Sequence, residues 1–256
     1  NIPEEPIVSA LRGFSAPFRL RQERPAAELA FLLACDPDFF NRWDAGQQLA
    51  TRAILEQMQN PAQQATGRLL TDTFRQLIGD TWQDLAYLAL LLSLPAEDYV
   101  SRFLEVIDPV AIHQSRQQLK QAIALALNGA WLALYEQHHR EDFNCFDAAA
   151  IGRRRLKNLC LDYLATLDSA EAQALAVTQF SSTRTMTDRI AALAAMINSQ
   201  NPHRPACLEA FYQQWQNDDL VVGKWFALQA TSYLPGTLGQ VKALMRHRAF
   251  DLRIPN

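Results

Sequence analysis

Glycine and cysteine are both scarce in this sequence, with 9 and 4 residues among 256. A low glycine content, together with frequent alanine, leucine and glutamine, favours helix over sheet. The cysteines form no C-x-x-C pair, so the sequence suggests neither a zinc knuckle nor a thioredoxin-like redox site. We expect buried structural thiols in a reducing compartment at the four positions, Cys35, Cys145, Cys160 and Cys207.

Strong net charge and long apolar runs are also missing. The formal net charge of −3 does not favour binding to nucleic acid or to an acidic membrane surface. The two longest uncharged stretches, Leu85–Leu94 and Gln121–Tyr135, are shorter than the ~20 apolar residues that span a bilayer. The first residues do not resemble a signal peptide. We therefore expect a cytoplasmic protein with neither a nucleic-acid partner nor a membrane partner.

The motifs of metal, nucleophile and phosphate chemistry are absent. No pair among the five histidines has the H-E-x-x-H spacing, which places two zinc-binding imidazoles and a glutamate base on one helix. His138-His139, followed by Glu141-Asp142, is the nearest approach to a ligand cluster, and a solvated helix terminus explains it better. Neither G-x-S-x-G nor G-x-x-x-x-G-K occurs. The sequence predicts no catalytic residue, no metal ligand and no cofactor bound by this chain.

Helical patterns follow one another from Pro25 onward, separated by breakers such as Asp108-Pro109 and Asn201-Pro202. Asp44 is expected to cap a helix that runs through Met58. Ala122–Tyr135 is expected to be a central helix in which Asn128 is a buried amide. The expected helices are Ala26–Ala34, Asp44–Met58, Ala62–Ile78, Trp82–Leu92, Ala96–Ile107, Pro109–His138, Asp147–Leu167, Ser169–Thr178, Met186–Asn198, Cys207–Gln216, Asp218–Ala230 and Pro235–Arg246.

Short turns between such helices are typical of antiparallel pairs stacked into a curved array. The first twenty or so residues differ, because they are proline-rich and end in an apolar and polar alternation near Phe18–Arg21 that indicates a strand. That strand lacks partner strands in the helical sequence that follows. The predicted fold class is therefore mainly α, an irregular solenoid of antiparallel helix pairs with a short N-terminal β remnant.

One basic run and five tryptophans could indicate a binding surface. Gly152–Lys157, with the sequence GRRRLK, could bind phosphate, but in a helix its side chains spread around the circumference. We interpret it as ordinary surface, with structural pairing and solvation of its charges. The tryptophans lie within apolar helical patterns and are expected in the core.

Several segments together are more specific than any single motif: Arg12–Pro17, Phe40–Gln47, Leu94-Pro95 with Asp108-Pro109, Gly152–Asn158, Met186–Arg189 and Val221–Gln229. They resemble, in this order, the bacterial aminopeptidase N family of zinc aminopeptidases. The first two look like the junction where an immunoglobulin-like β-sandwich meets the C-terminal helical domain. The resemblance implies terminal sandwich strands in residues 1–22 and a C-terminally truncated helical solenoid in residues 23–256.

Members of that family use zinc to remove N-terminal amino acids from peptides. Their H-E-x-x-H and G-A-M-E-N segments belong to a thermolysin-like domain, so the resemblance carries no catalytic residue over to this chain. It implies a noncatalytic region that walls the active-site cavity and controls substrate access, with zinc held elsewhere in the parent enzyme. The implied partners are the catalytic and sandwich domains of the same polypeptide, and peptide substrates reached through the shared cavity. The alternative is a free-standing helical-repeat scaffold that binds peptide or protein.

Asn41, Arg42, Trp43 and Asp44 are the candidate domain-docking residues. A cluster of polar, charged and aromatic side chains at a domain junction can pair across it. An equally weighted alternative is internal, with Asp44 as a helix cap and Trp43 in the helical core.

Overall fold

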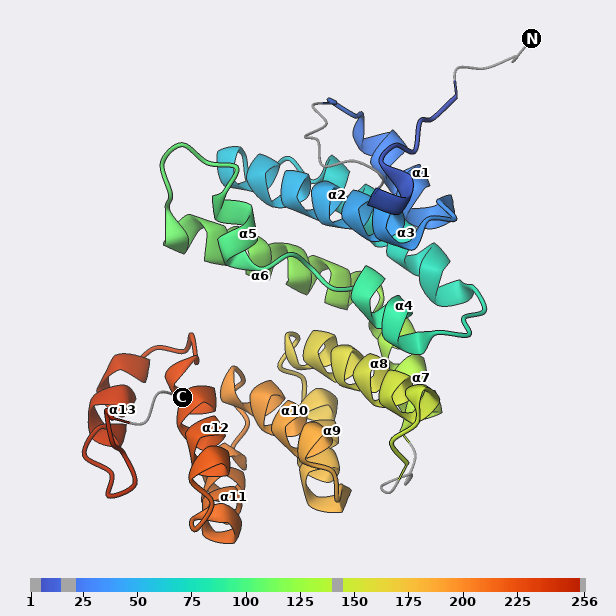
Figure 1. Ribbon diagram of the computed structural model, residues 1–256. Coiled ribbons are helices and arrows are strands. Elements are labelled where there is room, and N and C mark those ends of the chain that lie inside the picture. The colour runs from blue at the N-terminus through green and yellow to red at the C-terminus, as the bar shows by residue number, and fades with distance from the viewer. Residues whose placement is uncertain (1–5, 15–21, 140–144, 254–256) are drawn as a thin grey trace. The chain divides into compact units, whose positions relative to one another are not determined.

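The computed structural model describes residues 6–14, 22–139 and 145–253. These residues contain thirteen α-helices and one 3₁₀ turn, Arg12–Phe14, and no strand occurs among them. The helices belong to two compact units, Asn1–Ala130 and Trp131–Asn256 (Figure 1). The prediction of a mainly α, solenoid-like fold is confirmed.

The first unit is organised around one long helix, α2. This helix packs against α1, α3, α4 and α6, and Leu49, Ala53 and Ile54 on its inner face are buried. Gly46 lets α1 approach closely, because a Cβ atom there would lie 3.0 Å from Leu33 Cδ1. The helices of this unit are α1 (Ala26–Cys35), α2 (Phe39–Gln59), α3 (Ala65–Gly79), α4 (Leu85–Leu91), α5 (Glu97–Ser101) and α6 (Pro109–Ala126).

Helix α2 is capped by Asp38, so the prediction of a cap at Asp44 is wrong. The carboxylate of Asp38 accepts a hydrogen bond from the Asn41 backbone N–H at 2.9 Å, so α2 begins at Phe39. Asp44 lies inside the helix, five residues after Phe39, and is not its cap. Both aspartates precede the same apolar face, and the helix begins at the earlier one because Phe39–Trp43 can adopt helical geometry.

The long uncharged segment forms two helices instead of one. Helix α6 ends at Ala126, and Leu127 departs from helical geometry with φ −118° and ψ 18°. Ile123 and Leu127 are buried, whereas the side chain of Leu125 is 70% exposed. Asn128 begins the next helix and is exposed, so the prediction of a buried amide is wrong. The break gives its side chain access to water.

The second unit is a succession of short helices joined by tight turns. Helix α10 packs against α8, α9, α11 and α12, and α13 packs against α12; α9 to α13 follow one another in Figure 1. In the core, the rings of Trp131 and Tyr163 stack at 4.4 Å between centroids. The helices are α7 (Asn128–His138), α8 (Ala148–Ala165), α9 (Ala170–Ser182), α10 (Met186–Ile197), α11 (Arg204–Trp215), α12 (Asp219–Ala230) and α13 (Thr237–Leu244).

Two burial expectations need correction. Cys35 and Cys145 are exposed, because Cys35 is the last residue of α1 and Cys145 precedes α8. The other two thiols are buried as expected. Of the five tryptophans, Trp131 and Trp225 are buried, whereas the other three are half-buried.

Several expectations fall outside the described residues. The strand-like alternation near Phe18–Arg21 lies there, as do Glu141 and Asp142 of the histidine-flanking cluster. The boundary between residues 22 and 23 stays a prediction.

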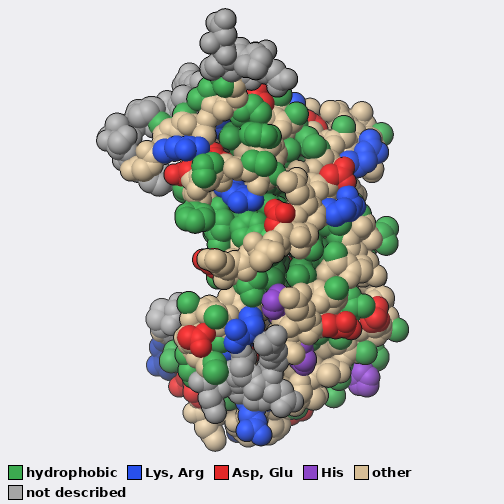
Figure 2. Space-filling view, turned by 90° about the vertical axis from the view of Figure 1, so that its right-hand side faces the viewer, with side chains coloured by type: hydrophobic (Ala, Val, Ile, Leu, Met, Phe, Trp, Pro, Cys, Tyr) green, Lys and Arg blue, Asp and Glu red, His purple; other side chains and the backbone are tan. Residues whose placement is uncertain are grey.

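The described surface carries charges of both signs. Lys, Arg, Asp and Glu side chains are interspersed with hydrophobic ones over the face drawn in Figure 2. Within the described part of the chain, no helix is long and apolar enough to cross a membrane.

Candidate domain-docking site and polar network

The segment that precedes the first helix is bonded to the start of α2. The Asn41 side-chain amide donates hydrogen bonds to the Ala10 carbonyl oxygen at 2.7 Å and to Ser9 Oγ at 2.9 Å. The Arg12 guanidinium lies 2.8 Å from Asp36 Oδ1, and the Asp36 side chain is fully buried. Asn41 and Asp36 therefore fix residues 9–12 against the corner between α1 and α2.

Arg42 acts within the helical unit. Its Nε donates to the Leu33 carbonyl oxygen at 2.7 Å and its Nη2 to that of Ala34, and its guanidinium lies 4.8 Å from the centre of the Trp82 ring. A cation at the last carbonyls of α1 is favoured by the helix dipole, and the ring adds a cation–π contact. These bonds hold α1 and α2 together.

Trp43 and Asp44 also have neighbours inside the unit. The Trp43 ring lies 5.6 Å from the Phe40 ring. The carboxylate of Asp44 accepts a hydrogen bond from Gln48 Nε2 at 2.6 Å, and burial raises the pKa of Asp44, with smaller lowering effects of Gln48 and Arg24. Of the four predicted docking residues, Asn41 is hydrogen-bonded to the described part of the segment assigned to the preceding domain. Docking to further domains stays a prediction for all four.

Large apolar side chains are exposed around this corner. Phe39 is 72% exposed at the first position of α2, and Val8, Phe31 and Phe40 are exposed as well. Exposed aromatic residues next to a bonded linker are typical of a surface that another domain covers. The sequence did not predict the contacts of Asp36 and Asp38, because loop contacts leave no periodic signal.

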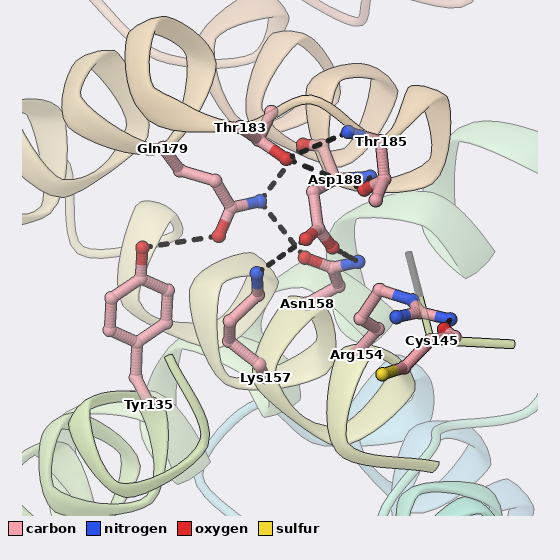
Figure 3. Close-up of polar contacts among 9 residues, drawn as sticks. All are labelled: Tyr135, Cys145, Arg154, Lys157, Asn158, Gln179, Thr183, Thr185 and Asp188. Atoms are coloured by element: carbon pink, nitrogen blue, oxygen red, sulfur yellow. Dashed lines mark hydrogen bonds and ion pairs between the residues drawn. The ribbon is translucent and has the colours of Figure 1, made fainter. Parts of the chain in front are cut away.

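A buried polar network joins four helices of the second unit (Figure 3). Lys157 Nζ on α8 lies 2.7 Å from Asp188 Oδ2 on α10, and their side chains are 3% and 5% exposed. Asn158 Nδ2 donates to the other oxygen of that carboxylate at 2.9 Å. Burial of two charges is tolerated when they are paired and further hydrogen-bonded, as they are here.

Gln179 extends the network to α9 and α7. Its Nε2 donates to Asn158 Oδ1 and to the Asp188 carbonyl oxygen, both at 2.9 Å. Tyr135 donates its hydroxyl to Gln179 Oε1 at 3.1 Å. Burial, and secondarily the negative charge of Asp188, raises the pKa of Tyr135, so this tyrosine stays protonated and can donate. The network therefore fastens the four helices in one register.

Only part of the basic run is ordinary surface, since Arg155 is exposed. Arg154 and Lys157 are buried, so the surface interpretation is wrong for both, although the expected pairing is found for Lys157. Their partners come from outside α8: Asp188 lies 31 residues downstream, and the Cys145 carbonyl oxygen accepts from Arg154 Nη2 at 2.8 Å. Spacing within one helix cannot reveal such partners.

An open groove of about 800 Å³ lies beside this network. Residues from the start of α8 and from the start of α10 line it. Three arginines, Arg154, Arg155 and Arg184, belong to the lining, together with apolar residues such as Phe146 and Ile190.

Metal ligands are not grouped anywhere in the described parts of the chain. No set of three or more His, Cys, Asp or Glu side chains there could hold a metal ion. The described residues thus do not fit a catalytic zinc site.

Stacked helices fastened by a buried polar network, with a groove at one surface, define a helical-repeat domain. The chain belongs to the family described as "Domain of unknown function (DUF3458_C) ARM repeats", which matches residues 26–256. The expected resemblance to the C-terminal helical domain of aminopeptidase N is confirmed.

Relatives with this resemblance are much longer than the chain. The chain is 36% identical over 256 residues to Aminopeptidase N of Caulobacter vibrioides, and 33% identical over 262 residues to Aminopeptidase N of Escherichia coli, covering 30% of each. The crystal structure of Legionella pneumophila aminopeptidase A in complex with aspartic acid matches 98% of this chain and 30% of its own, with a TM-score of 0.86 and 28% identity. The chain thus spans about 30% of these relatives.

Proposed function

We propose that this chain is a noncatalytic region of a longer zinc aminopeptidase and forms one wall of the cavity where peptides are cleaved. The observation that carries the proposal is the match of the whole chain to 30% of aminopeptidases N. In this proposal, zinc and its ligands lie in the rest of the polypeptide. A cytoplasmic location belongs to the same proposal and is supported by four free cysteines.

A wall of stacked helices suits this role physically. An enclosed chamber excludes folded proteins and bulk water but admits short peptides, and it restricts how a peptide can approach the reacting bond. The residues that support attachment to another domain are those that bond the N-terminal segment, above all Asn41 with Ala10. A fixed segment would hold the two domains in a constant orientation.

The test compares the longer enzyme with a shortened enzyme that ends before Phe18. Both are assayed with alanine and aspartate reporters and with short and long peptides, after zinc content is matched. Loss of the wall should lower the rate on short peptides or reduce discrimination against long ones. Equal rates and equal length preference in the two enzymes would refute access control.

A point variant tests the attachment. Asn41→Ala in the longer enzyme removes the bonds to residues 9 and 10, and we expect a lower melting temperature and faster hydrogen exchange at residues 9–12. The matched control is Gln63→Ala, which removes an exposed amide in the loop before α3. If the two variants behave alike, Asn41 does not hold the junction.

A further inference from the structure

We propose that Asn128 is a site of spontaneous covalent modification, at which the side-chain amide is lost and aspartate or isoaspartate is formed. Asn128-Gly129 is the one Asn-Gly pair in the sequence. Water is the only co-reactant, so the proposal goes beyond the proposed function and does not depend on zinc, on peptide substrates or on any other domain.

The chemistry begins with an attack inside the chain. The backbone nitrogen of Gly129 bonds to Cγ of Asn128, and the proton of that nitrogen passes through solvent to the amide nitrogen, which leaves as ammonia. Water then opens the five-membered succinimide ring. Hydrolysis of the new bond between nitrogen and Cγ gives aspartate, whereas hydrolysis of the original peptide bond gives isoaspartate. Because both reacting atoms belong to neighbouring residues, the rate depends on how easily the local backbone brings them together.

Gly129 removes the main steric barrier to this attack. A residue without a Cβ atom adopts backbone conformations that other residues avoid, and its nitrogen is more accessible. Gly129 is exposed, and a Cβ atom built on it would have no other heavy atom within 4 Å. The space beside the reacting nitrogen is therefore open to water.

The position of the pair at the start of α7 favours the reaction. Helical geometry keeps the following nitrogen away from Cγ, so the first turn must open. Leu127, before the helix, departs from helical geometry, and its apolar side chain cannot cap the turn. Gly129 is the second residue of α7, and the first four N–H groups of a helix have no acceptor within it. Glycine is also a poor helix former, which makes opening easier.

The other described asparagines are less suited to the reaction. Five of them have side chains that are hydrogen-bonded within the protein: Asn41, Asn60, Asn158, Asn198 and Asn201. Asn217 is exposed, but the next residue, Asp218, carries a Cβ atom and caps α12 with its side chain. Asn217 is therefore the internal comparison for an exposed asparagine without a following glycine.

The two products should affect the protein differently. Aspartate keeps the length of the main chain, and its charge at the start of α7 is favoured by the helix dipole. Isoaspartate adds a carbon atom to the main chain and so displaces the first turn. Trp131 lies three residues later, is fully buried, and stacks on Tyr163. Because this ring pair fixes the helix just beyond the modified residue, the isoaspartate form should melt at a lower temperature.

The experiment incubates the full chain at mildly alkaline and at mildly acidic pH, and follows conversion of amide to acid by mass spectrometry of proteolytic fragments. We expect conversion at Asn128 to be at least about tenfold faster than at Asn217, and faster at alkaline pH because the attacking nitrogen must lose its proton. Ion exchange separates the more negative products for thermal melting. The isoaspartate form should melt below the unmodified chain, whereas Asn128→Asp should not. An isoaspartate form that melts like the unmodified chain would refute the effect on α7.

Two variants locate the reaction. Gly129→Ala should slow conversion at Asn128 at least about tenfold, and the open space at this position lets the chain fold normally. Gly239→Ala is the matched control, since this exposed glycine also lies in a helix and has room for a Cβ atom, and it should leave the rate unchanged. Asn128→Gln should abolish the rapid phase of conversion, and circular dichroism checks that each variant is folded. Equal rates at Asn128 and Asn217, or an unchanged rate in Gly129→Ala, would overturn the proposal.

Discussion

The buried pair of Lys157 and Asp188 should be the most sensitive polar contact in the second unit. Asp188→Asn keeps the shape of the side chain but removes the charge that faces Lys157 Nζ at 2.7 Å. Lys157→Met removes the ammonium and leaves the carboxylate with the amide of Asn158. Each single substitution leaves one partner without its counter-charge.

The expected magnitude follows from burial. Both side chains are at least 95% buried, and removing one partner of such a pair costs about 3 to 5 kcal/mol because the other charge stays desolvated. The double variant Lys157→Met with Asp188→Leu buries no lone charge, so its loss should be smaller than the sum of the two single losses. An exposed pair provides the control, since Arg75→Gln beside Asp72 should cost no more than about 1 kcal/mol.

Urea unfolding at neutral pH provides the measurement. Helix content is followed by circular dichroism, and tryptophan fluorescence, to which the buried Trp131 of the same unit contributes, serves as a second probe. Agreement of the two probes is required before a free energy is assigned, because the chain contains two units. A loss below about 1 kcal/mol for Asp188→Asn, equal to that of Arg75→Gln, would refute the reasoning.

Four further substitutions test the first unit. Asp38→Ala should cost about 1 kcal/mol in urea unfolding through loss of the α2 cap, and Asp44→Ala should cost less, because Asp44 caps nothing and is partly desolvated. Gly46→Ala should lower the melting temperature, since its Cβ would lie 3.0 Å from Leu33 Cδ1 and overpacking of about 1 to 3 kcal/mol exceeds the gain in helix propensity. Burial, partly offset by an arginine charge, raises the pKa of Tyr87 to about 12, so the unfolded chain loses this proton first. The free energy of unfolding should therefore fall between about pH 10 and pH 12, and this fall should be less steep in the Tyr87→Phe variant.

Helix starts were the most predictable part of the fold. The expected helices at Asp147, Ser169 and Asp218 begin where these side chains accept hydrogen bonds from the first turn. A cap is a local feature, so its signal lies within four residues of sequence. The same rule chose wrongly at α2, where Asp38 and Asp44 both precede apolar helical residues and a local rule cannot rank them.

Burial of charge was the least predictable part. The spacing within GRRRLK correctly indicated a helix, but it could not show that Arg154 and Lys157 face inward. Their burial depends on Asp188 and on the Cys145 carbonyl oxygen. Partners at such separations become visible only once the helices are packed, because single-helix periodicity treats every charge as a candidate for solvent.

The segments that carried the family resemblance therefore combine two separable roles. Lys157 and Asp188 come from two of those segments and meet in one buried ion pair, so their pairing is explained by packing alone. Arg155 and Arg184 are exposed and line the groove, and the buried network does not include them. Arg155→Gln should thus leave the free energy of unfolding nearly unchanged, because Arg155 is exposed, whereas substitution of Lys157 should lower it. If both variants lose the same free energy of unfolding, the exposed and the buried residues of the basic run do not have separate roles.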